Sequence, residues 1–211
     1  MRKWYPLSVV VLALLISVLV YPRLPDRVPT HWDMQGNVND DSPRFVGAFL
    51  LPIFMIGIWG LMQVLPSIDP RRANYAKMRG AYDLVVNATL TMLLVVHAMV
   101  IAMILGAPFS LTRIVPALVG AMFVVIGNVL PQARPNWFFG IRTPWTLTND
   151  RVWRRTHRIA GYLFVACGLL MVASAAFPAT IGFPVTFAGA LIAGFGSVIF
   201  SFIVWKQETS K

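Results

Sequence analysis

The stretch Leu84–Leu105, LVVNATLTMLLVVHAMVIAMIL, decides the fold class because it carries no Asp, Glu, Lys or Arg. A helix needs about 20 mostly apolar residues to cross the hydrocarbon core of a membrane. Five further stretches approach that length: Trp4–Tyr21, Phe45–Leu65, Ile114–Leu130, Ile159–Phe177 and Phe183–Trp205. None alternates like a barrel strand, and backbone groups in lipid must bond internally. The sequence therefore predicts an all-α polytopic membrane protein, a six-helix transmembrane bundle.

The composition agrees with this prediction. The 211 residues are 57% hydrophobic and only 12% charged, against about 25% charged in soluble domains. The mean hydropathy is +0.69. These values exclude a disordered chain and an ordinary soluble fold. Cys167 is the single cysteine, which excludes an internal disulfide and a cysteine zinc cage.

The distribution of positive charge predicts the orientation. With the N-terminus inside, the inner segments carry 14 Lys and Arg and the outer segments carry four, Arg23, Arg27, Arg44 and Arg113. Basic residues collect on the cytoplasmic side, so both termini are expected in the cytoplasm. The net charge of +10 is then explained by topology, and no direct nucleic-acid partner is expected.

The first span resembles a signal peptide in its basic start, but Val20-Tyr21-Pro22-Arg23 is no small-residue cleavage site, so we expect an uncleaved helix. We find no convincing internal repeat. We predict two units: residues 1–65, two spans with an outer loop at 22–44, and residues 66–211, four spans with an inner loop at 131–158.

The outer loop contains three prolines that favour extended backbone, then Gly36 among asparagines, which indicates a turn. One interpretation is a binding site for a ligand outside the cell, and the other is an interfacial loop whose Trp32 lies among lipid headgroups. One histidine among scattered carboxylates is a weak metal signal, and no metal site is predicted. The candidate ligand-binding residues are Pro29, Thr30, His31, Trp32, Asp33 and Gly36.

The inner loop combines aromatic residues with arginines. Pro131 and Pro135 are expected to end the fourth span, Gly140 permits a tight turn, and Thr148 or Asn149 starts a helix that continues into the fifth span. Either an amphipathic interfacial helix on anionic lipid or a docking surface for a cytoplasmic partner fits this pattern. The candidate partner-binding residues are Asn128, Pro131, Asn136, Trp137, Phe139, Gly140, Arg142, Thr143, Pro144, Trp145, Trp153, Thr156 and His157.

Polar residues also occur inside the spans. Asp83, Asn87, Thr91 and His97 fall on one side of the third span, which suggests hydrogen bonds between helices or a path for a proton or ligand. Asn128 is a candidate for the same network. In the sixth span, small residues at Gly189, Ala193, Ser197 and Ser201 permit close packing, within the monomer or in a homodimer.

No hydrolase, metalloprotease or phosphate-binding motif is present, and no span carries paired carboxylates. We therefore predict no catalytic residues, no cofactor and no enzymatic activity.

The inner loop resembles a family signature. The residues that carry it are Gly127-Asn128, Pro131, Arg134 to Leu147, Trp153, Thr156-His157 and Gly161, and they are similar to the SdpI immunity-protein family. The outer Leu24-Pro25, Val28 to Trp32 and Gly36 resemble a small domain of unknown function found at the start of those proteins. Asn39 stands where the family often has Asp.

The resemblance implies a multi-pass protein of the bacterial inner membrane that protects its cell from a secreted killing peptide. It also implies signalling, in which the protein sequesters an ArsR-type autorepressor at the membrane. The alternative hypothesis is a small transporter or lipid-handling membrane protein, motivated by the polar residues Asn87, Thr91 and His97. The expected partners are membrane lipid, a hydrophobic peptide and the repressor.

Overall fold

The computed structural model describes residues 4–33 and 35–210. In this part of the chain six helices are long and apolar enough to cross a membrane, which confirms the predicted all-α bundle. They are α1 (Tyr5–Val20), α2 (Arg44–Ile68), α4 (Arg79–Ile104), α5 (Leu111–Val129), α7 (Asp150–Ser174) and α8 (Ala179–Thr209). The shorter elements are η1 (Tyr21–Arg23), β1 (Arg27–Trp32), β2 (Val38–Pro43), α3 (Ala73–Lys77), η2 (Leu130–Gln132) and α6 (Pro144–Thr148).

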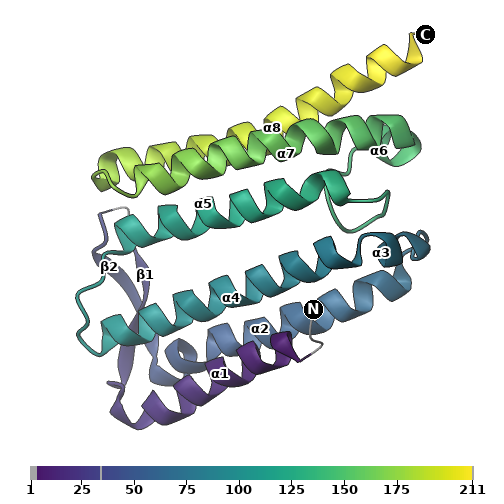
Figure 1. The fold of residues 1–211 in the computed structure, drawn as a ribbon. Helices are drawn as coiled ribbons and strands as arrows, with labels where there is room; N and C mark the ends of the chain where they lie inside the picture. Colours follow the sequence, from purple (N-terminus) through teal and green to yellow (C-terminus); the bar gives the residue numbers. More distant parts are fainter. Residues whose placement is uncertain (1–3, 34, 211) are drawn as a thin grey trace.

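The six long helices form two groups of three (Figure 1). Helices α1, α2 and α4 pack against one another, and so do α5, α7 and α8. The two groups meet where α4 contacts α5. The predicted division after residue 65 would place α4 with the later spans, whereas its packing joins it to α1 and α2. That division stays a prediction.

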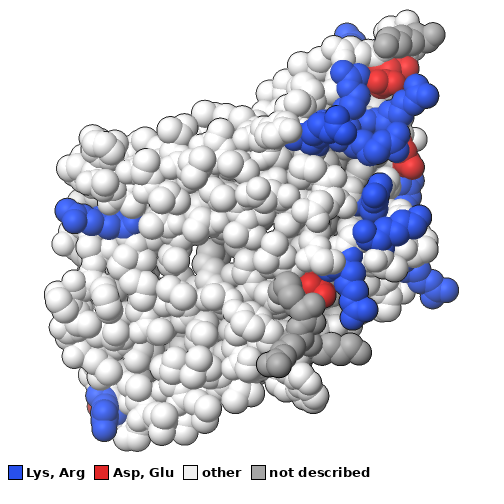
Figure 2. Space-filling model, in the orientation of Figure 1, with Lys and Arg blue, Asp and Glu red and all other residues white. Residues whose placement is uncertain are grey.

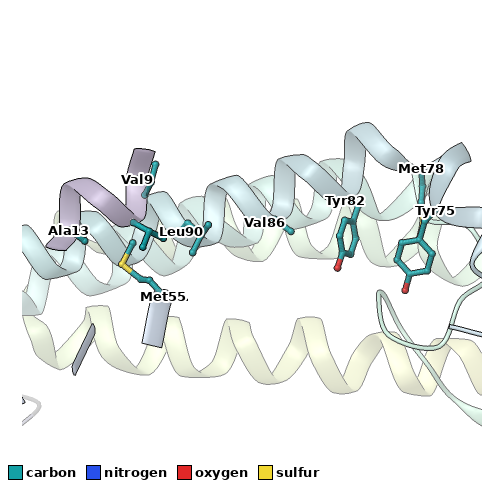
Figure 3. Close-up of a cluster of buried hydrophobic side chains, with 9 residues drawn as sticks. Val9, Ala13, Met55, Tyr75, Met78, Tyr82, Val86 and Leu90 are labelled. Atoms are coloured by element: carbon teal, nitrogen blue, oxygen red, sulfur yellow. The ribbon is translucent and has the colours of Figure 1, made fainter. Parts of the chain in front are cut away.

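The first group is held by a buried apolar cluster (Figure 3). Val9 and Ala13 of α1 meet Met55 of α2 and Leu90 of α4, and the cluster continues along α4 to Tyr82. Met55, Ala13 and Leu90 are fully buried. Because lipid tails are as apolar as these side chains, close packing rather than water exclusion stabilises such contacts.

Helices α5 and α7 approach each other at two pairs of glycines. A Cβ on Gly120 would lie 2.6 Å from the carbonyl oxygen of Gly168, and one on Gly127 would lie 2.7 Å from that of Gly161. Each reciprocal substitution would meet the facing backbone in the same way. The two antiparallel helices can therefore touch backbone to backbone only because these positions have no side chain.

The small residues of the sixth span pack within the monomer. Gly189 lies against Met171, and Ala193 joins Cys167 and Met171 in a buried cluster between α7 and α8. Ser197 and Ser201 are also buried. This arrangement agrees with the first alternative, in which the small residues pack within the monomer. A homodimer stays a prediction.

The segment before α2 forms an antiparallel hairpin of β1 and β2. The prolines predict extended backbone, and that is what the structure has; the strand pairing itself was not predicted. Val28 is fully buried and packs with Leu24, Ala48 of α2 and Ile101 of α4. The hairpin is thus fixed to the ends of the first group.

Lys and Arg gather at the end of the molecule opposite the hairpin (Figure 2), around the start of α7 and the end of α8. This asymmetry is the one that predicts a cytoplasmic face for that end. The orientation itself stays a prediction.

Candidate functional site

The aromatic loop, defined here as residues 131–149, is a folded structure built around Asn136. The Asn136 side chain is fully buried. Its Nδ2 donates to the carbonyl oxygens of Arg134 and Phe139, both at 2.8 Å, and its Oδ1 accepts the backbone N–H groups of Phe138 (2.9 Å) and Phe139 (2.6 Å). Both the nitrogen and the oxygen of the side-chain amide are therefore hydrogen-bonded, as is usual for a buried polar group. These bonds close the loop.

Asp69 connects this loop to the first helix group. It follows α2 directly and is 2% exposed. Its Oδ2 accepts the N–H of Trp137 (2.9 Å) and the hydroxyl of Tyr75 (3.0 Å), and its Oδ1 accepts the N–H of Arg71 (2.7 Å). Burial and the hydrogen bond to Asp69 raise the pKa of Tyr75 well above its usual value. The Tyr75 hydroxyl therefore stays a donor at physiological pH.

Further bonds reinforce the same connection. Asn74 Nδ2 donates to the carbonyl oxygen of Pro135 at 2.7 Å, and Arg71 Nη2 donates to that of Leu147 at 2.9 Å. Arg71 also lies 3.6 Å from Asp150 at the start of α7. The segment between α2 and α4 thus holds both ends of the aromatic loop.

His157 fixes the turn at Gly140 from the other side. The N–H of Ile141 donates to His157 Nε2 at 2.9 Å, so Nε2 carries no proton and Nδ1 donates to the carbonyl oxygen of Trp153 at 2.8 Å. The His157 and Trp153 rings, four residues apart on α7, stack at 4.1 Å. Gly140 has φ +105°, and a Cβ there would collide with His157 Nε2.

The end of the loop is joined to α8. Thr143 caps α6 in a reciprocal capping box with Thr146. Trp145 Nε1 donates to Ser201 Oγ at 2.5 Å, and the Thr143 hydroxyl lies 3.3 Å from the same oxygen. Asn149 then caps α7, which confirms the predicted helix start. Within the loop, Arg142 Nη1 donates to the carbonyl oxygen of Trp137 at 3.0 Å.

The structure brings the predicted inner residues into one region, but it divides them by exposure. The buried members are Asn136, Thr143, Trp153, Thr156 and His157. The exposed members are Asn128, Pro131, Trp137, Arg142 and Pro144, and the half-buried ones are Phe139, Gly140 and Trp145. A partner docking on this end could touch the exposed group directly, whereas the buried group shapes the loop. Partner binding itself stays a prediction.

At the opposite end, side-chain bonds order the hairpin. Asp33 Oδ1 accepts the N–H groups of Gln35 (2.9 Å) and Asn37 (2.8 Å). The bonds from Asn37 lower the pKa of Asp33 below its usual value, so the turn keeps a carboxylate at neutral pH. His31 Nδ1 lies 2.5 Å from Asn39 Oδ1. Since an amide oxygen only accepts, Nδ1 carries the proton.

The tip of the hairpin reaches the second helix group. A Cβ on Gly36, which has φ +88°, would lie 3.3 Å from Thr112 Cγ2 near the start of α5. Of the predicted outer residues, His31 is exposed, and Pro29, Thr30, Trp32, Asp33 and Gly36 are half-buried. Among residues 4–33 and 35–210 no three His, Cys, Asp or Glu side chains are grouped to hold a metal ion.

Two of the polar residues of α4, His97 and Thr91, lie within hydrogen-bond distance of α1, whereas Asp83 pairs with Arg79 of its own helix. His97 Nε2 lies 3.0 Å from the hydroxyl of Ser17 on α1, which donates to the carbonyl oxygen of Ala48 on α2 at 2.6 Å. Thr91 Oγ1 lies 2.7 Å from the hydroxyl of Tyr5. The prediction that Asn128 joins this network is wrong: Asn128 is exposed and bonds within its own helix, to the carbonyl oxygen of Val124 at 2.8 Å.

A groove of about 540 Å³ lies between the two groups, on the side where α4 faces α5. Apolar side chains such as Leu118 and Met122 line it, and Asn87, Thr91 and Tyr5 give it a polar edge. Its size suits an apolar segment such as part of a hydrophobic peptide or a lipid chain.

Comparisons with known proteins agree with the motifs. Residues 132–201 match the SdpI/YfhL protein family, and residues 9–56 match a domain of unknown function, DUF1648. The resemblance to the SdpI family is confirmed. The SdpI-like chain is also 28% identical, over 163 residues, to the immunity protein SdpI of Bacillus subtilis strain 168, covering 77% of this chain and 76% of the relative. No solved structure matches it significantly.

The six apolar helices and the bacterial relative place this SdpI-like chain in the bacterial inner membrane as a multi-pass protein. Sequence reasoning missed Asp69 and Tyr75, which anchor the aromatic loop. The sequence feature that could have drawn attention to Asp69 is its position, since it is an acidic residue directly after a membrane span. That signal does not reveal a partner 68 residues away, such as Trp137.

Proposed function

We propose that this chain is an immunity protein that protects its bacterium from a secreted hydrophobic peptide. The observation that carries the proposal is the similarity to an immunity protein, which extends over most of both chains. The matched regions include the hairpin and the aromatic loop. These are the two parts that connect the helix groups at opposite ends, which supports a role in sensing a ligand that changes how the groups pack.

The proposed mechanism begins at the hairpin. A peptide docks at Pro29–Asp33, and its apolar part occupies the groove between α4 and α5. The groove lies between the groups, so its shape depends on how the groups pack. Such a ligand shifts the protein only if it binds one packing state more tightly than the other. The exposed side chains Trp137 and Arg142 then become the contact for an ArsR-type autorepressor.

The protective part is tested by survival. A strain lacking this chain is challenged with the hydrophobic peptides secreted by its own species, with and without the gene restored. Restoration is expected to restore survival, and Trp32→Ala is expected to abolish that protection. Phe109→Ala is the control, since Phe109 is an exposed aromatic residue at the hairpin end and lies outside Pro29–Asp33. Equal killing with and without the chain contradicts immunity.

The groove has its own test in the same assay. Ala121→Phe fills the groove and is expected to reduce protection while the protein still inserts. Ala188→Phe adds the same volume at an exposed position of α8 and is expected to protect normally. Full protection by Ala121→Phe would remove the groove from the mechanism without affecting the immunity proposal.

The signalling part is tested by capture of the repressor from detergent extracts with and without peptide. Trp137→Ala is expected to weaken capture, since Trp137 is half exposed. Trp4→Ala is the control, as an exposed tryptophan at the same end. Capture that is independent of both peptide and Trp137 would contradict peptide-dependent sequestration.

The transporter alternative is less well supported. A transporter needs a connected polar path along α4. His97 and Thr91 instead bond to two different residues of α1 and are not linked to each other by these bonds. His97→Leu should abolish flux in reconstituted vesicles if the alternative holds. If the immunity proposal holds, neither the parent chain nor His97→Leu produces flux. The proposal assigns the chain no catalytic step.

A further inference from the structure

Helices α7 and α8 form a basic cleft that the proposed function does not use. The cleft has a volume of about 440 Å³ and lies beyond the aromatic loop. Its α7 side carries Arg151, Arg154, Arg155 and Arg158, and its α8 side carries Glu208. The arginine spacing of three and four residues puts all four on one face of the helix. Four positive charges therefore face one carboxylate.

Only two of these arginines are engaged by α8. Glu208 lies 2.8 Å from Arg155 Nη1 and 3.8 Å from Arg151 Nη1, and Gln207 Oε1 accepts from Arg155 at 3.1 Å. For Arg154 and Arg158, no ion pair or side-chain hydrogen bond occurs within the described parts of the chain, and both are exposed. They offer two guanidinium groups, each of which can bind a phosphate through two parallel N–H bonds.

The floor of the cleft is apolar. Ile159 of α7, which is 42% exposed, and Phe200 of α8 line the cleft next to Arg158. Tyr162 and Ile199, on the neighbouring surface, are 69% and 61% exposed. Exposed apolar side chains beside exposed arginines mark the boundary between headgroups and hydrocarbon. In Figure 2 the basic cluster borders an uncharged surface that covers the length of the helices.

We propose that this cleft is a binding site for an anionic phospholipid. The headgroup phosphate lies between Arg154 and Arg158, and an acyl chain covers Ile159 and Phe200. Basic pockets between transmembrane helices on the basic side are suited to anionic headgroups. An acidic protein segment would pair with the arginines but would leave the apolar floor uncovered, so the arrangement favours lipid.

The test measures lipid binding to the purified full-length chain in neutral detergent by native mass spectrometry. Dioleoylphosphatidylglycerol is expected to bind at least about five-fold more tightly than dioleoylphosphatidylcholine. The double variant Arg154→Gln/Arg158→Gln is expected to lose that preference. The control, Arg72→Gln/Arg134→Gln, removes the same charge from exposed arginines at the same end and is expected to keep it. A thermal melt compares the folding of both variants with that of the parent chain.

Two further measurements distinguish a phospholipid from a free phosphate compound and from an acidic peptide. Phe200→Ala is expected to weaken phosphatidylglycerol binding several-fold without changing the binding of glycerol phosphate. Glycerol phosphate that binds as tightly as the lipid would overturn the assignment, as would a poly-glutamate peptide that displaces the lipid at equal concentration. An equal loss in the two double variants would also overturn it, because bulk charge alone would then explain the preference.

Discussion

Gly140 is the residue that most directly sets the shape of the aromatic loop. Its positive φ and the closeness of His157 both require a position without a side chain. The sequence predicted a turn at Gly140 because it lies between aromatic residues. The contact with His157 could not be predicted, because it joins residues far apart in the chain and depends on how α7 packs.

Gly140→Ala is expected to destabilise the protein by about 1–3 kcal/mol, because the backbone becomes strained and the His157–Ile141 bond is disturbed. Thermal unfolding in detergent measures the change. Gly60→Ala in α2 is the matched control, since a Cβ there meets nothing within 4 Å. The same melting temperature for both variants would contradict the role given to Gly140.

At the scale of elements, the six spans could be predicted from apolar length alone, but the pairing of helices could not. Helix length follows from membrane thickness, which every span shares, so it does not identify neighbours. The contact of α5 with α7 depends on glycines that face each other across the two helices. The hairpin was also missed, since its prolines predict extended backbone without naming the strand that pairs with it.

Gly168→Ala is expected to separate α5 from α7, because its Cβ would lie 2.6 Å from the carbonyl oxygen of Gly120. We expect a loss of about 2 kcal/mol or more, as for other overpacked contacts. Unfolding in detergent again provides the measurement. Gly194→Ala, whose Cβ meets nothing within 4 Å, is expected to change stability little, and a loss in both variants would point to a general effect of glycine replacement.

At the scale of the whole molecule, the two helix groups contact each other through α4 and α5, and a groove lies beside that contact. The hairpin reaches Thr112 at one end, and Asp69 bonds the aromatic loop at the other. The sequence predicted that both candidate segments lie largely between spans, and the hairpin and the aromatic loop do. It could not show that many of the inner candidates, such as Trp153 and Thr156, are buried supports rather than exposed contacts.

Asp69→Ala is expected to weaken the connection between the groups. It leaves the N–H groups of Trp137 and Arg71 without their acceptor and leaves the Tyr75 hydroxyl only Asn136 Oδ1, at 3.3 Å. The expected cost is about 2 kcal/mol or more. Hydrogen exchange is expected to rise in the aromatic loop. Asp83→Ala removes a carboxylate whose ion pair is with Arg79 of the same helix and is expected to change exchange little. Unchanged protection in Asp69→Ala would contradict this role.

The proposed function depends most on which end of the molecule faces outside. The direct measurement uses a Cys167→Ala background, single cysteines and a membrane-impermeant maleimide. Val38→Cys in the exposed part of the hairpin and Lys77→Cys at the basic end report the two sides. We predict that Val38→Cys is labelled in intact cells and that Lys77→Cys is labelled only after the membrane is opened. Labelling of Lys77→Cys alone in intact cells would contradict the proposed orientation and the peptide-sensing hairpin with it.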